Sequence, residues 1–465
     1  MVARPRHFQS GTLVRLVIVG GVAAGTKAAA RARRVDPDLA ITLFQDEPCV
    51  AYSGCGQPYV LGGAIAEPDA LIIRRPEDFA RDRIDVRVRH HVTAIDPVGH
   101  RVHVHDLESD HRETVPYDRL ILATGARAIV PAVPGIDLAG VTTLRGMAAM
   151  HRLLAELDEA TTRQAVVVGG GYVGLEVVEA LMMRGLEVCL LERADYFPPR
   201  VDPDIATMVR GLLDRKGVKI ITGESLIRID GRGGRAESVL TSGGNTLPAQ
   251  LVVLALGVRP AVELAAASGI RIGPTGAIAV DERMATSAPD VFAAGDCAES
   301  RHRLTRNATW LPLGDSANLQ ARVAGENAAG GDARFPGVFG TSICKCFELA
   351  VGATGLTEAD ARLAGFDPIT ALIQAQDTAR YYPGAKPLTL KLVAEAGSGR
   401  LLGAQAAGTG RVDKLIDIAA TALLGKLTCD DLQNADLAYA PPFSPVLSPI
   451  IVASGLLARK TRDRI

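Results

Sequence analysis

Two stretches of the sequence repeat one pattern, and this pattern constrains the fold more than any other feature. Residues 13–34 read LVRLVIVGGVAAGTKAAARARR, and residues 163–185 read RQAVVVGGGYVGLEVVEALMMRG. In each stretch a short run of β-branched residues leads into clustered glycines and then into small residues typical of a helix. Strand, tight turn and helix in this order open a dinucleotide-binding βαβ unit. We therefore expect an α/β chain with two such units.

The glycines explain how these turns can approach a nucleotide. Glycine lets the backbone turn sharply and come close to a pyrophosphate, which rests on the N-terminus of the following helix. The second stretch has the complete G-x-G-x-x-G pattern, whereas the first has only its outer glycines. Two nucleotide sites in one chain predict two cofactors, or one cofactor and one nucleotide substrate. The glycines expected to contact them are Gly20 and Gly25 in the first stretch and Gly169, Gly171 and Gly174 in the second.

Each unit continues into a second strand that ends in polar residues. The run DLAITLFQDE ends at Gln45, Asp46 and Glu47, and the run LEVCLLERAD brings Glu192 to the same place. An acidic side chain there accepts hydrogen bonds from ribose hydroxyls. Glu192 should therefore favour NADH, although the adjoining Arg193 could instead bind the 2′-phosphate of NADPH.

Further apolar strands should close each nucleotide domain. Residues 117–128 (YDRLILATGARA) and 249–260 (AQLVVLALGVRP) are similar to each other, and residues 286–299 (TSAPDVFAAGDCAE) end a strand in Gly-Asp. Open α/β sheets bind ligands at the carboxyl ends of their strands, where these segments place small and acidic residues. The residues concerned are Ala123, Thr124, Gly125, Gly257, Gly295 and Asp296.

The composition limits the classes of binding partner and the cellular compartment that we expect for this protein. The net charge of −1 offers no basic field for nucleic acid or an anionic membrane. The chain has no run of about 18 uninterrupted apolar residues, and its first twelve residues lack the apolar core of a secretory signal. Seven scattered cysteines without a C-x-x-C pair predict neither a disulfide framework nor a metal site. We expect a cytoplasmic protein.

One cysteine lies in an unusual setting. Residues 51–59 read AYSGCGQPY, so Cys55 is flanked by two glycines. A lone cysteine is usually a small buried apolar residue, and this alternative is the starting expectation for Cys55. Cys49 is the only nearby thiol, and five residues separate the two.

Taken together, these features resemble the flavin- and nicotinamide-dependent disulfide reductase superfamily over nearly the whole chain. The finer match is to its single-cysteine branch, which includes coenzyme A disulfide reductases, NADH-dependent polysulfide or persulfide reductases, and NADH oxidases. Three stretches carry it: SGCGQPYVLGG, ARYYPGAKPLTLKL and DLAYAPPFSPVLSPI. The resemblance implies two Rossmann-like domains, for FAD and NAD(P), and a C-terminal α+β dimerisation domain. The expected boundaries are 1–140 with 265–338 for FAD, 141–264 for NAD(P), and 339–465 for dimerisation.

The same resemblance implies roles for individual residues. Cys55 becomes the redox-active nucleophile beside the flavin, and one thiol suffices because a thiolate can form a mixed disulfide with its substrate. Tyr439 is expected to donate a proton across the dimer, with Tyr381 rather than Tyr382 beside it. Val92 and Glu176 join the cofactor contacts. The residues expected to hold the substrate, with a coenzyme A derivative as the first candidate, are Lys27, Arg31, Arg34, Arg83, Asn318 and Tyr382.

The resulting expectation is a homodimeric FAD enzyme that uses NADH, or NADPH, to reduce a small disulfide, persulfide or polysulfide through Cys55. The alternatives are an NADH oxidase acting on oxygen or peroxide and a redox-sensing flavoprotein. Oxidase and peroxidase relatives usually place a histidine in the first glycine loop, and GGVAAGTK has none. The sequence also departs from the branch, because Gln57 replaces a common leucine and Gln45 replaces the glutamate that usually binds the FAD ribose.

Overall fold

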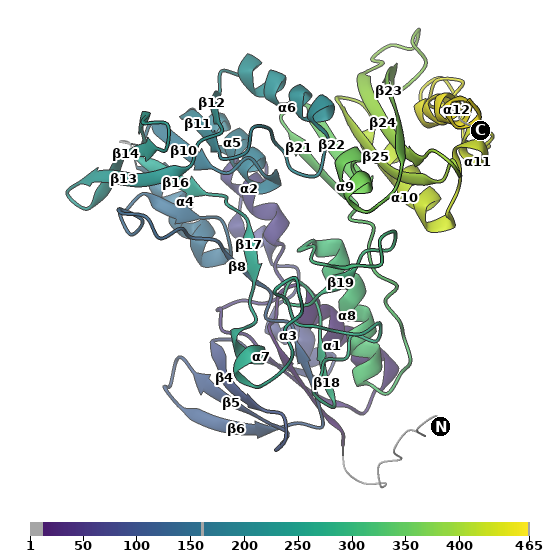
Figure 1. The fold of residues 1–465 in the computed structure, drawn as a ribbon. Coiled ribbons are helices and arrows are strands. Elements are labelled where there is room, and N and C mark those ends of the chain that lie inside the picture. The colour runs from purple at the N-terminus through teal and green to yellow at the C-terminus, as the bar shows by residue number, and fades with distance from the viewer. Residues whose placement is uncertain (1–12, 160–161, 464–465) are drawn as a thin grey trace. The chain divides into compact units, whose positions relative to one another are not determined.

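The computed structural model describes residues 13–159 and 162–463, which form two compact units (Figure 1). The first unit contains the described residues up to 60, together with 65–128 and 258–338. The second contains 61–64, the described part of 129–257, and 339–463. The expectation about the first twelve residues lies outside the described part of the chain.

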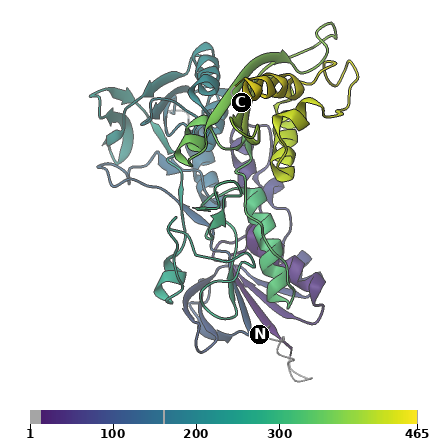
Figure 2. The same cartoon turned by 45° about the vertical axis from the view of Figure 1, so that its right-hand side comes forward.

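The first unit is built on a five-stranded parallel sheet with strand order β3-β2-β1-β7-β18. Strand β1 is almost fully buried, as expected for the central strand of a parallel sheet covered on both faces. Helices α1 (Ala24–Val35) and α8 (Gly314–Ala328) pack side by side, as Figures 1 and 2 show. A Cβ atom at Gly325 would lie 2.9 Å from the Cα atom of Ala28, so this glycine allows the close packing. The strands are β1 (Arg15–Val19), β2 (Ala40–Phe44), β3 (Ile84–Arg87), β7 (Arg119–Leu122) and β18 (Val291–Ala293).

Smaller elements complete the first unit. Three antiparallel strands, β4 (His90–Asp96), β5 (Arg101–Asp106) and β6 (Arg112–Pro116), form a separate sheet. Strand β8 (Ala126–Ala128) pairs with β17 (Val258–Pro260), and β19 (Ser300–Arg301) pairs with β20 (Ala308–Thr309). The short helices are η1 (Gly54–Gly56), η2 (Pro68–Leu71), α3 (Pro76–Arg81) and α7 (Glu263–Ala267), while α2 (Gln57–Leu61) begins in this unit and ends in the other.

The second unit begins with another five-stranded parallel sheet, of order β12-β11-β10-β16-β9. Its central order repeats that of the first sheet, because β10 lies between β11 and β16 as β1 lies between β2 and β7. The strands are β9 (Val141–Thr143), β10 (Gln164–Val168), β11 (Glu187–Glu192), β12 (Lys219–Thr222) and β16 (Leu251–Leu254). The helices are α4 (Met147–Asp158), α5 (Tyr172–Met183) and α6 (Pro203–Arg215), and β13 (Leu226–Arg232), β14 (Arg235–Thr241) and β15 (Thr246–Pro248) form an antiparallel sheet.

The C-terminal part of the second unit is an antiparallel sheet of order β21-β22-β25-β24-β23. Helix α10 packs on β22 and β25, whereas α12 packs on β23 and β24. The strands are β21 (Ser342–Cys346), β22 (Leu349–Gly355), β23 (Pro368–Gln376), β24 (Pro387–Glu395) and β25 (Leu401–Gly408). The helices are α9 (Glu358–Leu363), α10 (Val412–Gly425), α11 (Cys429–Gln433) and α12 (Pro449–Arg462).

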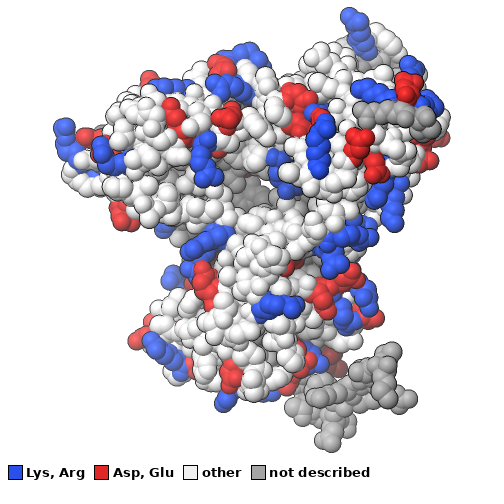
Figure 3. All heavy atoms as spheres, in the orientation of Figure 1, with Lys and Arg blue, Asp and Glu red and all other residues white. Residues whose placement is uncertain are grey.

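The architecture confirms the expected fold class, with two parallel α/β sheets and a C-terminal α+β module. Within the described ranges, no helix is both long and apolar enough to cross a membrane. On the face drawn in Figure 3, cationic and anionic side chains alternate over the described residues without a continuous patch of one sign. This mixture agrees with the net charge of −1.

A buried lysine lies at the centre of an ion-pair cluster in the second unit. Lys391 on β24 has a side chain that is only 6% exposed, and its Nζ lies 3.0 Å from Asp202 Oδ2 and 2.9 Å from Asp204 Oδ2. The third carboxylate, of Glu358, is 3.3 Å away. Gln405 on the neighbouring strand donates to Asp202 at 2.7 Å. The cluster therefore joins the start of α6 and the start of α9 to the C-terminal sheet.

We expect Lys391→Met to destabilise the protein strongly. The substitution leaves three carboxylates around an uncompensated, largely buried position, and removing one partner from a buried ion pair costs about 3–5 kcal/mol. Arg362→Met is the matched control, because Arg362 pairs with the same Glu358 but is 59% exposed, and an exposed pair contributes less than about 1 kcal/mol. The melting temperature, measured by thermal unfolding, should decrease much more for Lys391→Met than for Arg362→Met. Equal decreases in the two variants would contradict this account.

Candidate active site

The first glycine loop is a turn that only glycines can form. Gly20 follows β1 with φ of +103°, and a Cβ atom there would collide with the carbonyl group of Ala123, just after β7. A Cβ atom at Gly25 would collide with the carbonyl oxygen of Gly20. The loop therefore brings the end of β7 and the start of α1 against one another. This narrow cradle at a helix N-terminus fits the pyrophosphate of a dinucleotide.

The second glycine loop repeats the first. Gly169 has φ of +111°, and its hypothetical Cβ would meet the carbonyl group of Ala255, while Gly174 packs against the carbonyl oxygen of Gly169. Gly171 differs, because no atom lies within 4 Å of its hypothetical Cβ. This open side, at the residue that precedes α5, leaves the backbone accessible to a second dinucleotide.

A side chain at the end of the second strand supports each loop. Gln45 Oε1 accepts a hydrogen bond from Gly21 N at 2.7 Å, and Glu192 Oε2 accepts one from Gly170 N at 2.6 Å. Glu192 also accepts from the backbone N–H of Ala194 at 2.7 Å. An amide and a carboxylate thus make the same contact in the two units. Gln45 is therefore a direct support of the loop as well as a candidate ribose contact.

The remaining residues expected around the first cofactor lie along the same sheet edge or beside it. Thr124 Oγ1 donates to the carbonyl oxygen of Ala261 at 2.6 Å, and Gly125 has φ of +73°. The N–H of Gly295 donates to Gln320 Oε1 at 2.8 Å, and Trp310 Nε1 donates to the carbonyl oxygen of Asp296 at 2.8 Å.

Three further predicted cofactor residues have distinct settings. Asp46 Oδ2 lies 3.5 Å from His91 Nδ1 on β4. Val92 is buried beside a register shift in the same strand, and Gly257 has φ of +89° after β16.

Sequence reasoning missed Gln320, a buried amide on α8 that fixes Gly295, because nothing in the sequence of that helix distinguishes it.

Cys55 lies on η1 and is exposed. Its loop is held at two points just before the cysteine, because Ser53 N donates to the carbonyl oxygen of Leu71 and Ala51 N donates to that of Gly21, both at 2.8 Å. The cysteine loop is thus hydrogen-bonded directly to the first glycine loop. This connection places an accessible thiol only four residues from the backbone of the first cradle.

The other six cysteines are less accessible, and burial raises their pKa values. Cys49 is partly buried and the rest are buried, and no disulfide joins Cys49 to Cys55. Because the thiolate is the reactive form, raised pKa values make these thiols poor nucleophiles at neutral pH. Burial raises the pKa of Cys49 and Cys189 to about 11 and of Cys344 and Cys429 to about 12, and it also raises the pKa of Cys297 and Cys346.

Two tyrosines from distant parts of the C-terminal module meet. The hydroxyl groups of Tyr381 and Tyr439 are hydrogen-bonded, which raises the pKa of Tyr439. Their side chains are 75% and 45% exposed. Tyr382 instead lines a hollow in the same module. The structure thus brings together Tyr381 and Tyr439 and leaves Tyr382 apart from that pair.

Most polar residues expected to bind the substrate already have partners. Arg31 Nη2 lies 2.5 Å from Glu326 Oε2, Arg34 donates to the carbonyl oxygen of Ala30, and Arg83 donates to that of Pro37. Asn318 Nδ2 donates to the carbonyl oxygen of Gly314 at 2.8 Å. Lys27 makes no side-chain hydrogen bond or ion pair with any described residue.

Glu176 is a partly buried acid on α5, the helix that follows the second glycine loop. Burial, together with the nearby charge of Glu179, raises the pKa of Glu176 to about 7. Nearby, the hydroxyl groups of Tyr172 and Ser342 are 2.9 Å apart. The charge of Glu176 therefore changes within the physiological pH range.

Two dinucleotide cradles and one exposed thiol together define an oxidoreductase that couples nucleotide and sulfur chemistry. The family model described as pyridine nucleotide-disulphide oxidoreductase matches residues 14–310, and that of its dimerisation domain matches residues 341–449. The chain belongs to the pyridine nucleotide-disulphide oxidoreductase family. This membership confirms the family expected from the sequence.

The similar proteins cover nearly the full chain. A Pyrococcus horikoshii protein named NAD(P)H coenzyme A polysulfide/persulfide reductase is 38% identical over 95% of this chain and 98% of its own. A Methanocaldococcus jannaschii protein named NADH oxidase is 36% identical over 97% of this chain and 100% of its own. The solved structure of an NAD-dependent persulfide reductase from A. fulgidus has a TM-score of 0.94 and 39% identity, covering 97% of this chain and 84% of the other.

We expect the oxidation of NADH to depend on the charge of Glu176. The carboxyl group is neutral below its pKa of about 7 and anionic above it. The nicotinamide ring becomes positively charged as it gives up hydride, so an anion near it favours the reaction. The rate of NADH oxidation in rapid-mixing experiments should rise with pH through this range.

Glu176→Gln should remove that rise and leave the rate near the low-pH value of the wild type. Glu179→Gln is the useful comparison, because Glu179 raises the pKa of Glu176 through its charge. That variant should shift the rise to lower pH without abolishing it. An unchanged pH profile in the Glu176 variant would contradict the assignment.

Proposed function

We propose that the protein is a homodimeric FAD enzyme in which NAD(P)H provides electrons to reduce a small disulfide, persulfide or polysulfide bound covalently at Cys55. The observation that carries the proposal is the exposed Cys55 on a loop hydrogen-bonded to the first glycine loop. A nucleophilic thiol that exchanges electrons with a cofactor must lie beside that cofactor. The hydrogen bond between the cysteine loop and the first glycine loop fixes the position of one loop relative to the other.

The glycine cradles support the two cofactors. The first unit, with Gly20, Gly25 and the Gln45 contact, would hold FAD, and the second, with its open Gly171, would hold the nicotinamide dinucleotide. FAD, when bound, supplies two-electron transfer between the nicotinamide and the sulfur centre. Glu192 would accept hydrogen bonds from the adenosine ribose of NADH and repel the 2′-phosphate of NADPH, so we propose NADH as the preferred donor.

Cys55 would carry the sulfur chemistry as a nucleophile. Its thiolate attacks one sulfur of the substrate disulfide, a bond from Sγ to that sulfur forms, and the original sulfur–sulfur bond breaks. The leaving thiolate takes a proton. Two electrons, ultimately from NAD(P)H, then cleave the mixed disulfide and release the second thiol. The balance is one disulfide, one NAD(P)H and one proton giving two thiols and NAD(P)⁺.

Tyr439 would supply the proton to the leaving thiolate, with Tyr381 holding its hydroxyl group. We propose that this pair serves Cys55 of the partner subunit, so that the complete site requires a dimer. Exposed apolar side chains near Tyr439, including Phe443 at 56%, Val446 at 69% and Leu447 at 59%, support a subunit interface there. The match of residues 341–449 to the dimerisation domain covers this segment.

Names of similar proteins support the substrate class. The Pyrococcus horikoshii relative is named for coenzyme A polysulfide/persulfide reduction, and a 29% identical protein from Staphylococcus haemolyticus is named coenzyme A disulfide reductase. We therefore propose coenzyme A disulfide, coenzyme A persulfide or polysulfide as the substrate. The NADH oxidase named among the relatives makes oxygen the second candidate. Anaerobic NADH turnover on a panel of these sulfur compounds, compared with oxygen consumption in air, distinguishes the two.

We expect Cys55→Ser to separate the two half-reactions. NADH should still bleach the flavin absorbance, because hydride transfer does not use the thiol. Disulfide reduction should fall to background, since a serine hydroxyl is a far weaker nucleophile at neutral pH and cannot form a mixed disulfide. Stopped-flow absorbance and anaerobic turnover measure the two steps.

Cys49→Ser provides the matched control, because it removes the nearest thiol in sequence while leaving Cys55 in place. This variant should retain disulfide turnover. Loss of turnover in Cys49→Ser, with full turnover in Cys55→Ser, would make Cys49 the redox centre.

We expect Tyr439→Phe to slow the disulfide step without affecting flavin reduction. Loss of a positioned proton donor typically costs about 10²–10⁴-fold in rate. Tyr381→Phe should have a smaller effect, because it removes only the hydrogen-bond partner of Tyr439. The comparison is made by single-turnover reduction of the disulfide. A larger effect from Tyr381→Phe would reverse the roles of the two tyrosines.

A further inference from the structure

The segment that carries Tyr439 has no helix or strand of its own to support it. Residues 434–448, between α11 and α12, lie outside the helices and strands of the C-terminal module. The backbone contacts inside the segment are short-range, because Phe443 N and Ser444 N both donate to the carbonyl oxygen of Ala440. Segments of this kind open locally with little cost in free energy. The Tyr439 hydroxyl group therefore keeps one position only if groups outside the segment hold it.

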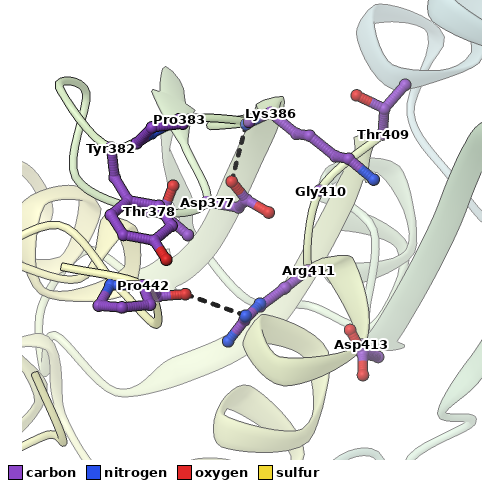
Figure 4. A pocket seen from close by; sticks show the side chains of 11 residues that line it. Asp377, Thr378, Tyr382, Pro383, Lys386, Thr409, Gly410, Arg411, Asp413 and Pro442 are labelled. Carbon is purple, nitrogen blue, oxygen red and sulfur yellow. Dashed lines mark hydrogen bonds between the residues drawn. The ribbon is translucent and has the colours of Figure 1, made fainter. Parts of the chain in front are cut away.

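Arg411, the residue before α10, holds this segment through its guanidinium group. Its Nη2 donates to the carbonyl oxygen of Pro442 at 3.0 Å (Figure 4), and its Nη1 donates to that of Phe443 at 3.5 Å. The guanidinium carbon also lies 5.3 Å from the centre of the Phe443 ring, which adds a cation–π contact. A guanidinium group presents its donors as a rigid planar fork, so it can hold two acceptors in one geometry. Arg411 thus fixes the backbone three and four residues beyond Tyr439.

A second contact fixes the loop between β23 and β24 that carries Tyr381. Asp377 Oδ1 accepts from the backbone N–H of Lys386 at 2.8 Å (Figure 4), and Asp377 N donates to the carbonyl oxygen of Lys386 at 2.9 Å. These two hydrogen bonds close the base of the loop. Asp377 also packs against Gly410, where a Cβ atom would lie 2.6 Å from the Cβ atom of Asp377. The base of the Tyr381 loop therefore contacts the residue that precedes Arg411.

The two tyrosine-bearing segments are also joined to each other. Ala379 N donates to the carbonyl oxygen of Pro441 at 3.2 Å, so the two segments share a backbone hydrogen bond. The hydrogen bond between the hydroxyl groups of Tyr381 and Tyr439 is a second connection. Both tyrosine side chains are exposed, so burial alone does not fix their positions. The backbone contacts on either side must supply that order.

Arg411 borders a hollow of about 340 Å³, whose wall also contains Asp377, Lys386 and Pro442. The guanidinium group of Arg411 makes no ion pair with a described residue, and its hydrogen bonds go to backbone carbonyl groups. The Lys386 ammonium group makes no hydrogen bond or ion pair with a described residue. The hollow thus has two cationic side chains in its wall, and of these two Arg411 is the one bonded to the Tyr439 segment.

We propose that Arg411 is a positioning residue for the tyrosine pair: its guanidinium group holds the backbone after Tyr439, so that the Tyr439 hydroxyl group stays against Tyr381. Arg411 acts through Tyr439 and does not itself touch the reacting sulfur. This assignment rests on the proposed function, because that function gives the Tyr439 hydroxyl group its task as proton donor. Since a displacement of about 1 Å can cost about 10²-fold in rate, the two carbonyl contacts of Arg411 matter for the reaction.

The kinetic test replaces Arg411 and follows the disulfide step in single turnover. Arg411→Ala should lower the rate constant of this step by about 10–100-fold, as expected for a misplaced proton donor. The substrate concentration that gives half the maximal rate should not change, and NADH should reduce the flavin at the wild-type rate. Arg411→Lys should recover only part of the loss, because an ammonium group cannot hold both carbonyl oxygens in a fixed geometry.

Lys386→Ala is the matched control, because Lys386 brings the same charge to the wall of the same hollow without a bond to the Tyr439 segment. The disulfide step of this variant should proceed at the wild-type rate. Equal decreases in Arg411→Ala and Lys386→Ala would overturn the proposal, because they would assign the effect to the charge of the hollow.

A double-mutant cycle tests whether Arg411 acts through Tyr439. Tyr439→Phe already lacks the proton donor, so adding Arg411→Ala should slow the disulfide step little further, and the two effects should not add. A low concentration of guanidinium ion should partly restore the rate of Arg411→Ala, because the shortened side chain leaves room for the ion beside Pro442. The same addition should not accelerate Tyr439→Phe. Additive decreases in the double variant would overturn the positioning role.

Hydrogen–deuterium exchange separates this proposal from the proposed function, since it requires no turnover. The N–H groups of Ala379, Phe443 and Ser444 all donate to carbonyl oxygens of the Tyr439 segment. Peptides that contain these groups should exchange faster in Arg411→Ala than in wild type, because the segment opens more often. The same peptides should exchange at the wild-type rate in Lys386→Ala.

The outcomes distinguish the two proposals. Faster exchange in Arg411→Ala, together with no disulfide turnover by wild type, retains Arg411 as the residue that holds the tyrosine pair and rejects the proposed function. Disulfide turnover by wild type, with unchanged exchange in Arg411→Ala, rejects the positioning role and retains the function. Faster exchange with an unchanged disulfide step also rejects the positioning role, because the reaction would then not depend on where Tyr439 is held.

Discussion

The close approach of one carbonyl group to a glycine is the contact on which the rest of this structure depends. After β1 the chain must turn within a single residue, and the space on its inner side is already occupied by the carbonyl group of Ala123. Gly20 fits because it has no Cβ atom and adopts a positive φ. Any larger residue would separate β7 from α1 and open the cradle between them. The same requirement recurs at Gly169 against Ala255 in the other unit.

The residue after Gly20, Gly21, connects this turn to two other segments of the first unit. Gly21 donates its N–H to Gln45 and accepts a hydrogen bond at its carbonyl oxygen from Ala51. One peptide segment thus fixes the end of the second strand and the start of the loop that carries Cys55. The position of the thiol is therefore determined by backbone geometry, which is less variable than a contact between side chains. Burial of Gln45 keeps water from competing for this hydrogen bond.

Features determined by neighbouring residues could be predicted from the sequence, and features determined by distant ones could not. The strands, glycine turns and helices follow from local patterns, so β1, α1, β10 and α5 appear where the repeated stretches predict them. The pairing of Tyr439 with Tyr381 was expected only from the family resemblance, because no spacing in the sequence reveals how the loop near residue 381 folds back. Likewise, Arg31 looked available on a helix, but Glu326, 295 residues away, pairs with it.

The sequence also could not predict which polar side chains are buried. Thr378 and Lys391 each lie in segments whose polar residues would ordinarily be exposed, and only the packed C-terminal module shows that they are enclosed. The unpaired hydroxyl of one and the three carboxylates around the other follow from packing between elements rather than from the residues themselves. Such sites become visible only when strands and helices from different parts of the chain have been brought together.

The contrast between Cys55 and the other six thiols has a consequence for chemical labelling. Six cysteines are kept protonated at neutral pH by burial, and one is exposed at the surface of η1. A maleimide dye or an alkylating electrophile added to the native protein therefore reacts first at Cys55, because Cys49 is only partly exposed and burial raises its pKa. A spectroscopic probe can be attached there without first replacing the remaining cysteines. For the same reason, sulfane sulfur released near the protein should react at Cys55 rather than at the six less accessible cysteines.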